Sequence, residues 1–185
     1  MSKMKMKMKK LVLGLVLLVS TLSFGQVEKI ELSGSDVFLT LNFQYQNPND
    51  ITWNPYGSYK TSILRLGPSA KSSLIQAISK AIEWSKLNKT HKRDFVKVIC
   101  TFKVMDKDTY QRFGYSNNFS REMIVEFKGY SNGSFDLYLK TKERIKSSYI
   151  PVEMSISINT INELENFKKY LNSKNINKEI DEIFK

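Results

Sequence analysis

Residues 122–141 read EMIVEFKGYSNGSFDLYLKT, and this stretch decides the class of fold that we expect. Apolar and polar residues alternate over 122–128 and again over 135–141, which is the period of a strand with one buried face. Between them lies Asn132-Gly133. This dipeptide is typical of tight hairpins because both residues tolerate the positive φ angles of the favoured turn. The stretch therefore predicts two antiparallel strands joined by a turn.

The same alternation recurs on both sides of this hairpin. It predicts further strands over residues 27–32, 37–45, 61–66, 95–105 and 150–158. In the strand over 95–105 we expect one apolar face directed at the core, formed by Val96, Val98, Cys100, Phe102 and Val104. Cys100 is the only cysteine, so the chain holds no internal disulfide and its stability must come from core packing.

Helical spacing of apolar residues appears at three places. A helix is predicted from Pro68 through Leu87, and a second follows Thr160, which forms a capping box with Glu163. A short third helix is expected over 177–184. Long strand–helix–strand crossovers are absent, so we predict an α+β fold. Its sheet is mainly antiparallel, with five to seven strands and with one central and one or two C-terminal helices packed on one face.

Residues 1–25 have the pattern of a cleavable secretory signal peptide. Lysines precede an apolar run over 11–22, and the small residues of Ser23-Phe24-Gly25 follow. The alternative is an uncleaved membrane anchor, but the run falls short of the roughly 20 residues that a bilayer span needs. Cleavage leaves a single α+β domain over 26–185 with 24 basic and 18 acidic residues, a net charge of +6.

Few residues are available for catalysis. The chain has one histidine, His91, and one cysteine, Cys100, which is too few for a zinc site, and it carries no nucleophile-elbow motif. No cofactor or metal is therefore expected. We predict a protein without catalytic activity; the alternative is an exported hydrolase that uses a pair of carboxylates, since two such acids need only converge in space.

Aromatic residues beside amide side chains form the first candidate surface. Such rings suit stacking against a sugar or a peptide, and binding residues concentrate in loops. The alternative is that the rings fix long loops to the core. The candidate ligand-binding residues are Trp53, Tyr56, Tyr59 and Tyr115.

A basic cluster at the end of the first predicted helix forms the second candidate surface. It would contact an anionic surface through Lys86, Lys89, Lys92 and Arg93. The alternative is a solvated helix end, where cations are stabilising without any ligand.

Together these features predict a small exported bacterial protein, periplasmic or extracellular, that acts as a binding or envelope-associated module. Its candidate partners are a glycan, a peptide or an anionic envelope surface, and nucleic acid is not expected outside the cell.

Overall fold

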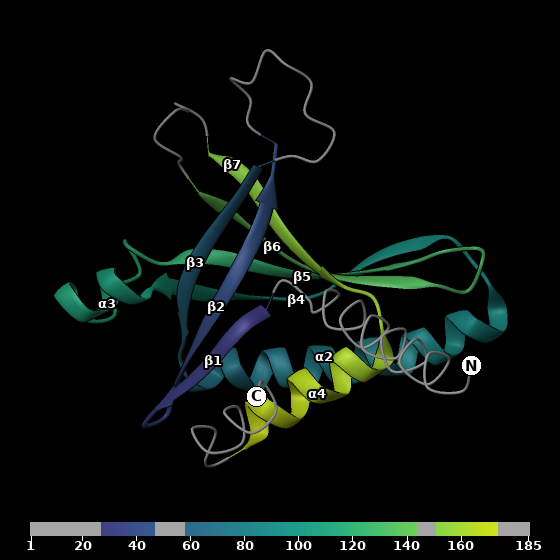
Figure 1. The fold of residues 1–185 in the computed structure, drawn as a ribbon, viewed down its shortest axis with the longest axis horizontal. Helices are drawn as coiled ribbons and strands as arrows, with labels where there is room; N and C mark the ends of the chain where they lie inside the picture. Colours follow the sequence, from purple (N-terminus) through teal and green to yellow (C-terminus); the bar gives the residue numbers. More distant parts are fainter. Residues whose placement is uncertain (1–26, 47–57, 144–150, 174–185) are drawn as a thin grey trace, which may run out of the picture.

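The computed structural model describes residues 27–46, 58–143 and 151–173. Within these ranges the chain forms seven strands and three helices (Figure 1). In chain order they are β1 (Val27–Ser33), β2 (Asp36–Tyr45), β3 (Ser58–Leu66), α2 (Pro68–His91), β4 (Phe95–Asp106), α3 (Lys107–Phe113), β5 (Arg121–Gly129), β6 (Phe135–Glu143), β7 (Val152–Ile158) and α4 (Ile161–Asn172).

All seven strands belong to one antiparallel sheet in which each strand pairs with the next along the chain. β2 also pairs with β7, through Gln44 opposite Ser155 and Tyr45 opposite Met154. This extra pairing closes β2 to β7 into a six-stranded barrel. β1 pairs with the first half of the β2 edge whose far end pairs with β7. The predicted α+β class with a large antiparallel sheet is confirmed. The closure was not predicted, because alternation along a strand does not reveal its neighbours.

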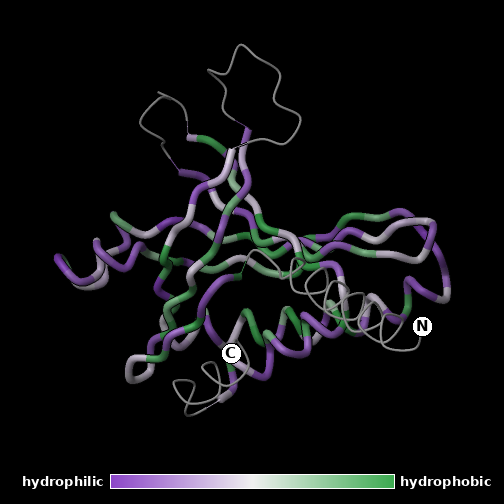
Figure 2. Tube along the Cα trace, in the orientation of Figure 1, coloured by the Kyte–Doolittle hydropathy of each residue, from purple (hydrophilic) through white to green (hydrophobic). Residues whose placement is uncertain are grey.

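The core lies inside the barrel and between the sheet and the helices. Hydrophobic and hydrophilic residues alternate along the strands and recur turn by turn along α2 (Figure 2). Large side chains without solvent exposure include Phe43 of β2 and Phe127 of β5. α2 contributes Leu74 and Ile78, contacts β4 and β5, and lies beside α4.

The predicted hairpin forms between β5 and β6, but its turn differs from the expected one. Only Gly133 takes a positive φ, 87°. Asn132 instead accepts hydrogen bonds at Oδ1 from the backbone N–H of Ser134 (2.8 Å) and from its hydroxyl (2.6 Å). The N–H of Tyr130 donates to the carbonyl of Ser134 at 3.0 Å, so the loop is wider than a two-residue turn.

The predicted buried face of β4 is wrong over its first half. The register with β5 shifts between Val98 and Cys100, as in a β-bulge, and such an extra residue reverses the faces on which the following side chains lie. Val96 and Val98 are consequently 55% exposed. Cys100 is half-buried against the core, with its Sγ 3.9 Å from the carbonyl of Ser73, and burial raises the pKa of its thiol.

Two of the three predicted helices lie within the described residues. α2 and α4 are confirmed, and Thr160 caps α4 by accepting the N–H of Glu163 at 3.2 Å. α3 was not predicted, and it lies between two predicted strands. The predicted signal peptide and the helix over 177–184 lie outside the described residues. Among the described residues, no helix has the length and apolar character needed to cross a membrane.

Candidate functional site

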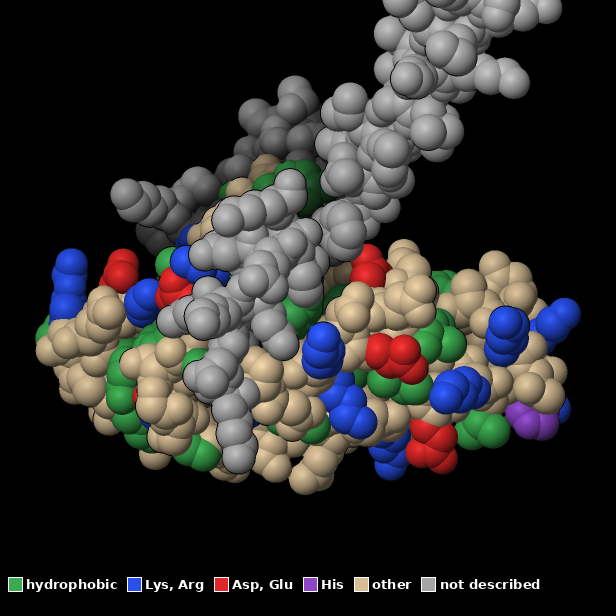
Figure 3. Space-filling model, turned by 60° about the horizontal axis from the view of Figure 1, so that its bottom comes forward, with side chains coloured by type: hydrophobic (Ala, Val, Ile, Leu, Met, Phe, Trp, Pro, Cys, Tyr) green, Lys and Arg blue, Asp and Glu red, His purple; other side chains and the backbone are tan. Residues whose placement is uncertain are grey.

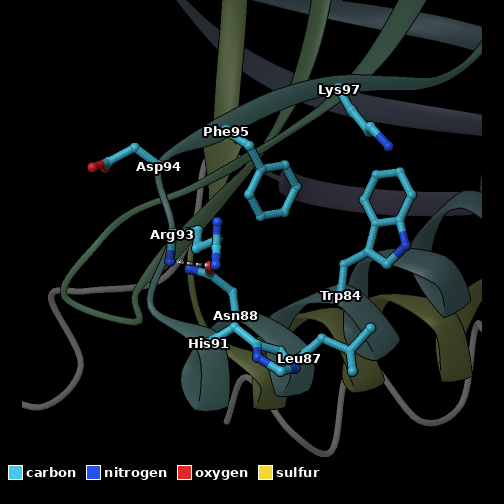
Figure 4. A pocket seen from close by; sticks show the side chains of 8 residues that line it. All are labelled: Trp84, Leu87, Asn88, His91, Arg93, Asp94, Phe95 and Lys97. Atoms are coloured by element: carbon cyan, nitrogen blue, oxygen red, sulfur yellow. Dashed lines mark hydrogen bonds between the residues drawn. The ribbon is translucent and has the colours of Figure 1, made fainter.

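A cleft of about 420 Å³ opens between the second half of α2 and the first half of β4 (Figure 4). We call it the α2–β4 groove. It is lined by Trp84, Leu87, Asn88, His91, Arg93, Asp94, Phe95 and Lys97.

The spacing of residues on the two elements explains which side chains reach the groove. Trp84, Leu87 and His91 are three and four positions apart, so they share one side of α2, next to its buried stripe. Phe95 and Lys97 are two positions apart on β4 and share one strand face. They precede the bulge, which therefore decides that these two residues face the groove rather than Val96 and Val98.

Packed aromatic rings form the apolar wall of the groove. The Trp84 ring meets Phe95 edge-on at a centroid distance of 6.2 Å, and both rings contact the buried Phe127 at 5.6 and 5.5 Å. Phe95 stands opposite Gly129 in the β4–β5 register. A Cβ atom at Gly129 would lie 2.5 Å from Cε1 of Phe95, so glycine is what lets this ring pack here.

Asn88 lines the groove and makes three structural hydrogen bonds with its side chain. Its Nδ2 donates to the carbonyls of Tyr130 and Ser134, each at 2.9 Å, and its Oδ1 accepts the N–H of Arg93 at 3.1 Å. The chain leaves the helix here through Lys92, whose φ is 50° and whose N–H donates to the Asn88 carbonyl at 2.7 Å. Asn88 therefore ties α2, β4 and the β5–β6 hairpin together, and both of its amide N–H donors are used in doing so.

The charge on the groove is predominantly positive. The ammonium groups of Lys80 and Lys97 lie 5.2 and 5.7 Å from the centroid of the Trp84 ring. Asp94, the one acid among the lining residues, points away from the cleft and accepts the N–H of Ser131 at 2.9 Å (Figure 4). Within the described residues, neither Arg93 nor Lys97 forms an ion pair, so both cations can engage an anion beside an apolar wall.

The predicted basic cluster lies at one end of this groove. Lys86 and Lys89 are exposed on the last turns of α2, followed by exposed Lys92 and Arg93. Figure 3 shows Lys and Arg side chains around the end of the molecule that carries His91. Of the four predicted cations only Arg93 lines the groove itself, and Lys97 joins it from β4.

The two predicted aromatic residues that the structure describes, Tyr59 and Tyr115, lie apart from each other. Trp53 and Tyr56 lie outside the described residues. Tyr59 is 56% exposed at the start of β3, whereas Tyr115 is 52% exposed beyond α3, with the guanidinium of Arg65 5.5 Å from its ring centroid. Tyr59 and Arg65 are six positions apart on β3, which is a separation of about 20 Å, so Tyr59 and Tyr115 lie near opposite ends of that strand.

A cluster of charged residues outside the groove joins β3, β4, β5 and β6, and we call it the second polar cluster. Its members are Lys60, Asp106, Arg121 and Glu143. Glu143 pairs with Lys60 at 2.7 Å and with Arg121 at 2.5 Å, and Arg121 also pairs with Asp106 at 2.9 Å. Burial raises the pKa of Asp106 above its usual value. Burial would raise the pKa of Glu143 too, but the hydrogen bond from Lys60 and the charge of Arg121 outweigh it and lower that pKa. The Arg121 guanidinium thus bridges the two carboxylates.

Several groove residues escaped the sequence analysis, namely Trp84, Leu87, Phe95 and Lys97. The spacing of Trp84, Leu87 and His91 was a usable signal, because it marks a second helix face beside the buried stripe. Phe95 and Lys97 gave no such signal, since their orientation depends on the bulge in β4.

The chain matches no protein-family model, and no match is found for it among curated proteins or solved structures. Across the three described ranges, no three His, Cys, Asp or Glu side chains come together as a metal-binding group. Its function is therefore inferred from the chemistry of the α2–β4 groove.

Proposed function

We propose that this chain is a non-catalytic binding or envelope-associated module that takes anionic ligands in the α2–β4 groove. One observation carries the proposal: Arg93 and Lys97 lie beside the Trp84 and Phe95 rings without an acidic partner among the described residues. An anion placed there would gain charge-assisted hydrogen bonds, which are about twice as strong as neutral ones.

The groove also favours a ligand with an apolar part. Its volume of about 420 Å³ lies in the range of small-ligand sites, roughly 300 to 1,000 Å³, and such sites combine apolar walls with a few polar groups. Leu87, which is 50% exposed, adds apolar surface to the groove. An acidic peptide, an acidic glycan and an anionic lipid surface all combine these properties, which supports them as the proposed partners.

We further propose that the protein is bacterial and is exported to the periplasm or the medium as a single domain over 26–185. The lysine-rich pattern of residues 1–25 supports this. Intact mass measured on the periplasmic or secreted fraction should correspond to a chain that begins at Gln26. A mass that retains residues 1–25 would contradict export by cleavage.

A hydrolase that uses carboxylates is the second candidate. Its support is that Asp106 and Glu143 have pKa values shifted in opposite directions, a pattern of acid–base pairs. The Arg121 guanidinium, however, pairs with both carboxylates and occupies the space between them. This arrangement favours a structural role. Hydrolysis of a chromogenic glycoside by the purified chain, lost in Asp106→Asn, would reverse the ranking.

The groove can be tested by fluorescence, since the chain has only two tryptophans. In a Trp53→Phe background, emission comes from Trp84 alone. Titration with hexaglutamate, dextran sulfate and phosphatidylglycerol vesicles should change this emission for at least one probe, with an affinity that falls as salt rises.

Charge reversal then locates the site. Arg93→Glu with Lys97→Glu should weaken binding roughly tenfold or more, because two charge-assisted contacts are lost. The matched control is Arg112→Glu with Lys169→Glu, which changes the net charge equally at two exposed positions of α3 and α4. Equal weakening in both variants would show only general attraction to a basic protein and would contradict the proposal.

A further inference from the structure

The first half of β4 has a free edge in the described part of the chain. β3 pairs with β4 only at its far end, through Leu64 opposite Asp106 and Arg65 opposite Met105. Over its remaining length β4 pairs with β5 on one side. Among the described strands none lies on the other side of Phe95–Val98, so half of the backbone N–H and C=O groups there lack a strand partner.

This free edge borders the α2–β4 groove. The side chain of Phe95 enters the groove while Val96 and Val98 are exposed on the opposite face of the same strand. α2 forms the other wall, where Trp84 and Leu87 lie across from β4 (Figure 4). An extended segment that bonds to this free edge would place alternate side chains toward the groove.

The positive charge beside the free edge favours an acidic segment as the added strand. Arg93 and Lys97 lie on the groove side, and Lys86, Lys89 and Lys92 stand near its end. A second copy of this chain, paired edge to edge, would bring these cations together, and like charges on facing strands are destabilising. A chain with acidic residues on one face complements them, and apolar residues on its other face would pack beside Val96 and Val98.

We propose that β4 accepts an extended peptide with alternating acidic and apolar residues as an added strand along Phe95–Val98. This inference rests on the proposed function, since it names the ligand class of the same groove. The bulge that follows Val98 ends the regular ladder, so about four residues of the peptide pair, over a length of roughly 13 Å. Main-chain hydrogen bonds supply affinity, and the cations select the acidic face.

The test uses the mature chain and a capped Glu-Val-Glu-Val-Glu-Val peptide. Three probes are compared with it: the same peptide N-methylated at every residue, the block peptide Glu-Glu-Glu-Val-Val-Val, and a polyacrylate of similar charge. Binding is followed by Trp84 emission in the Trp53→Phe background, and backbone amide exchange is measured by NMR.

Strand addition predicts that the alternating peptide binds and that N-methylation weakens it about tenfold or more, since backbone donors and space along the edge are lost. The block peptide should also bind more weakly. Some amides between Phe95 and Val98 should exchange more slowly in the complex, with α3 amides unchanged as an internal control.

The failures of the two proposals are distinguishable. If polyacrylate and the N-methylated peptide bind as well as the alternating peptide, strand addition is wrong while the anionic groove stands. If no anionic probe changes Trp84 emission, both are wrong. Sedimentation that shows peptide-independent dimers, with the amides between Phe95 and Val98 protected from exchange in the dimer, would assign the edge to a second copy and overturn the proposal.

Discussion

The side chain of Asn88 holds the two walls of the groove together. It is only 2% exposed, and its side chain links the end of α2 to the start of β4 and to the β5–β6 hairpin. Gly133 packs against the same helix end. A Cβ atom at this position would lie 3.4 Å from Cα of Lys89. An asparagine in the last turn of a helix looks from sequence like an ordinary polar position, so its role could not be predicted.

Asn88→Ala should lower the free energy of unfolding by about 2 kcal/mol, because three hydrogen bonds are lost in a buried setting. Urea unfolding checks the loss, and amide exchange should accelerate first in the β5–β6 turn. Asn166→Ala, an exposed position of α4, serves as the control and should change the free energy of unfolding little. Equal stability of the Asn88 and Asn166 variants would contradict the linking role.

Glu143 provides a residue-scale test of the second polar cluster. Its pKa in the folded chain lies below the ordinary 4.5, so the unfolded chain binds more protons near that pH. Its contribution to stability is therefore present above about pH 4.5 and is lost as the pH falls through the lowered folded-state pKa.

Glu143→Gln should reduce the free energy of unfolding by about 1 to 3 kcal/mol at pH 7, because contacts with two cations lose their charge. The difference from the unmodified chain should shrink as the pH is lowered below 4.5. Urea unfolding at a series of pH values measures it, with Glu165→Gln on the exposed side of α4 as a control. A difference independent of pH would rule out the assigned shift.

At the scale of elements, sequence patterns located nearly every strand and helix but not their details. Alternation and capping residues act locally, so β6 and α4 were predicted close to their observed bounds. The β4 bulge depends on pairing with β5, and it exchanged the faces of Val96 and Phe95. For the same reason the groove was only half predicted, through Arg93 at its basic end.

The cap of α4 gives a prediction for an element. Thr160→Ala should lower the free energy of unfolding by about 1 kcal/mol, because the Glu163 N–H loses its acceptor. Thr160→Ser keeps the hydroxyl and should retain most of the stability. Thermal unfolding of the three chains measures the effect, and a serine variant as unstable as the alanine variant would show that the cap is not the cause.

For the whole molecule, closure of the sheet and the free edge are related. β2 pairs with both β3 and β7. β3 pairs with β4 at only two positions, so the first half of β4 extends away from the barrel and forms the groove with α2. Long-range pairings of this kind follow from three-dimensional packing, which a pattern of single residues does not encode. The net charge of +6 predicted for residues 26–185 adds a long-range attraction for anionic partners.

The most direct measurement of the central claim is a chemical-shift map of the ¹⁵N-labelled chain titrated with hexaglutamate. We expect the largest shifts at the Trp84 indole N–H and at backbone amides from Arg93 to Val98, and small shifts near Tyr115 and Tyr59. Largest shifts around Tyr115 or Tyr59, with Trp84 unmoved, would contradict the account and place the binding surface on the exposed aromatic residues instead.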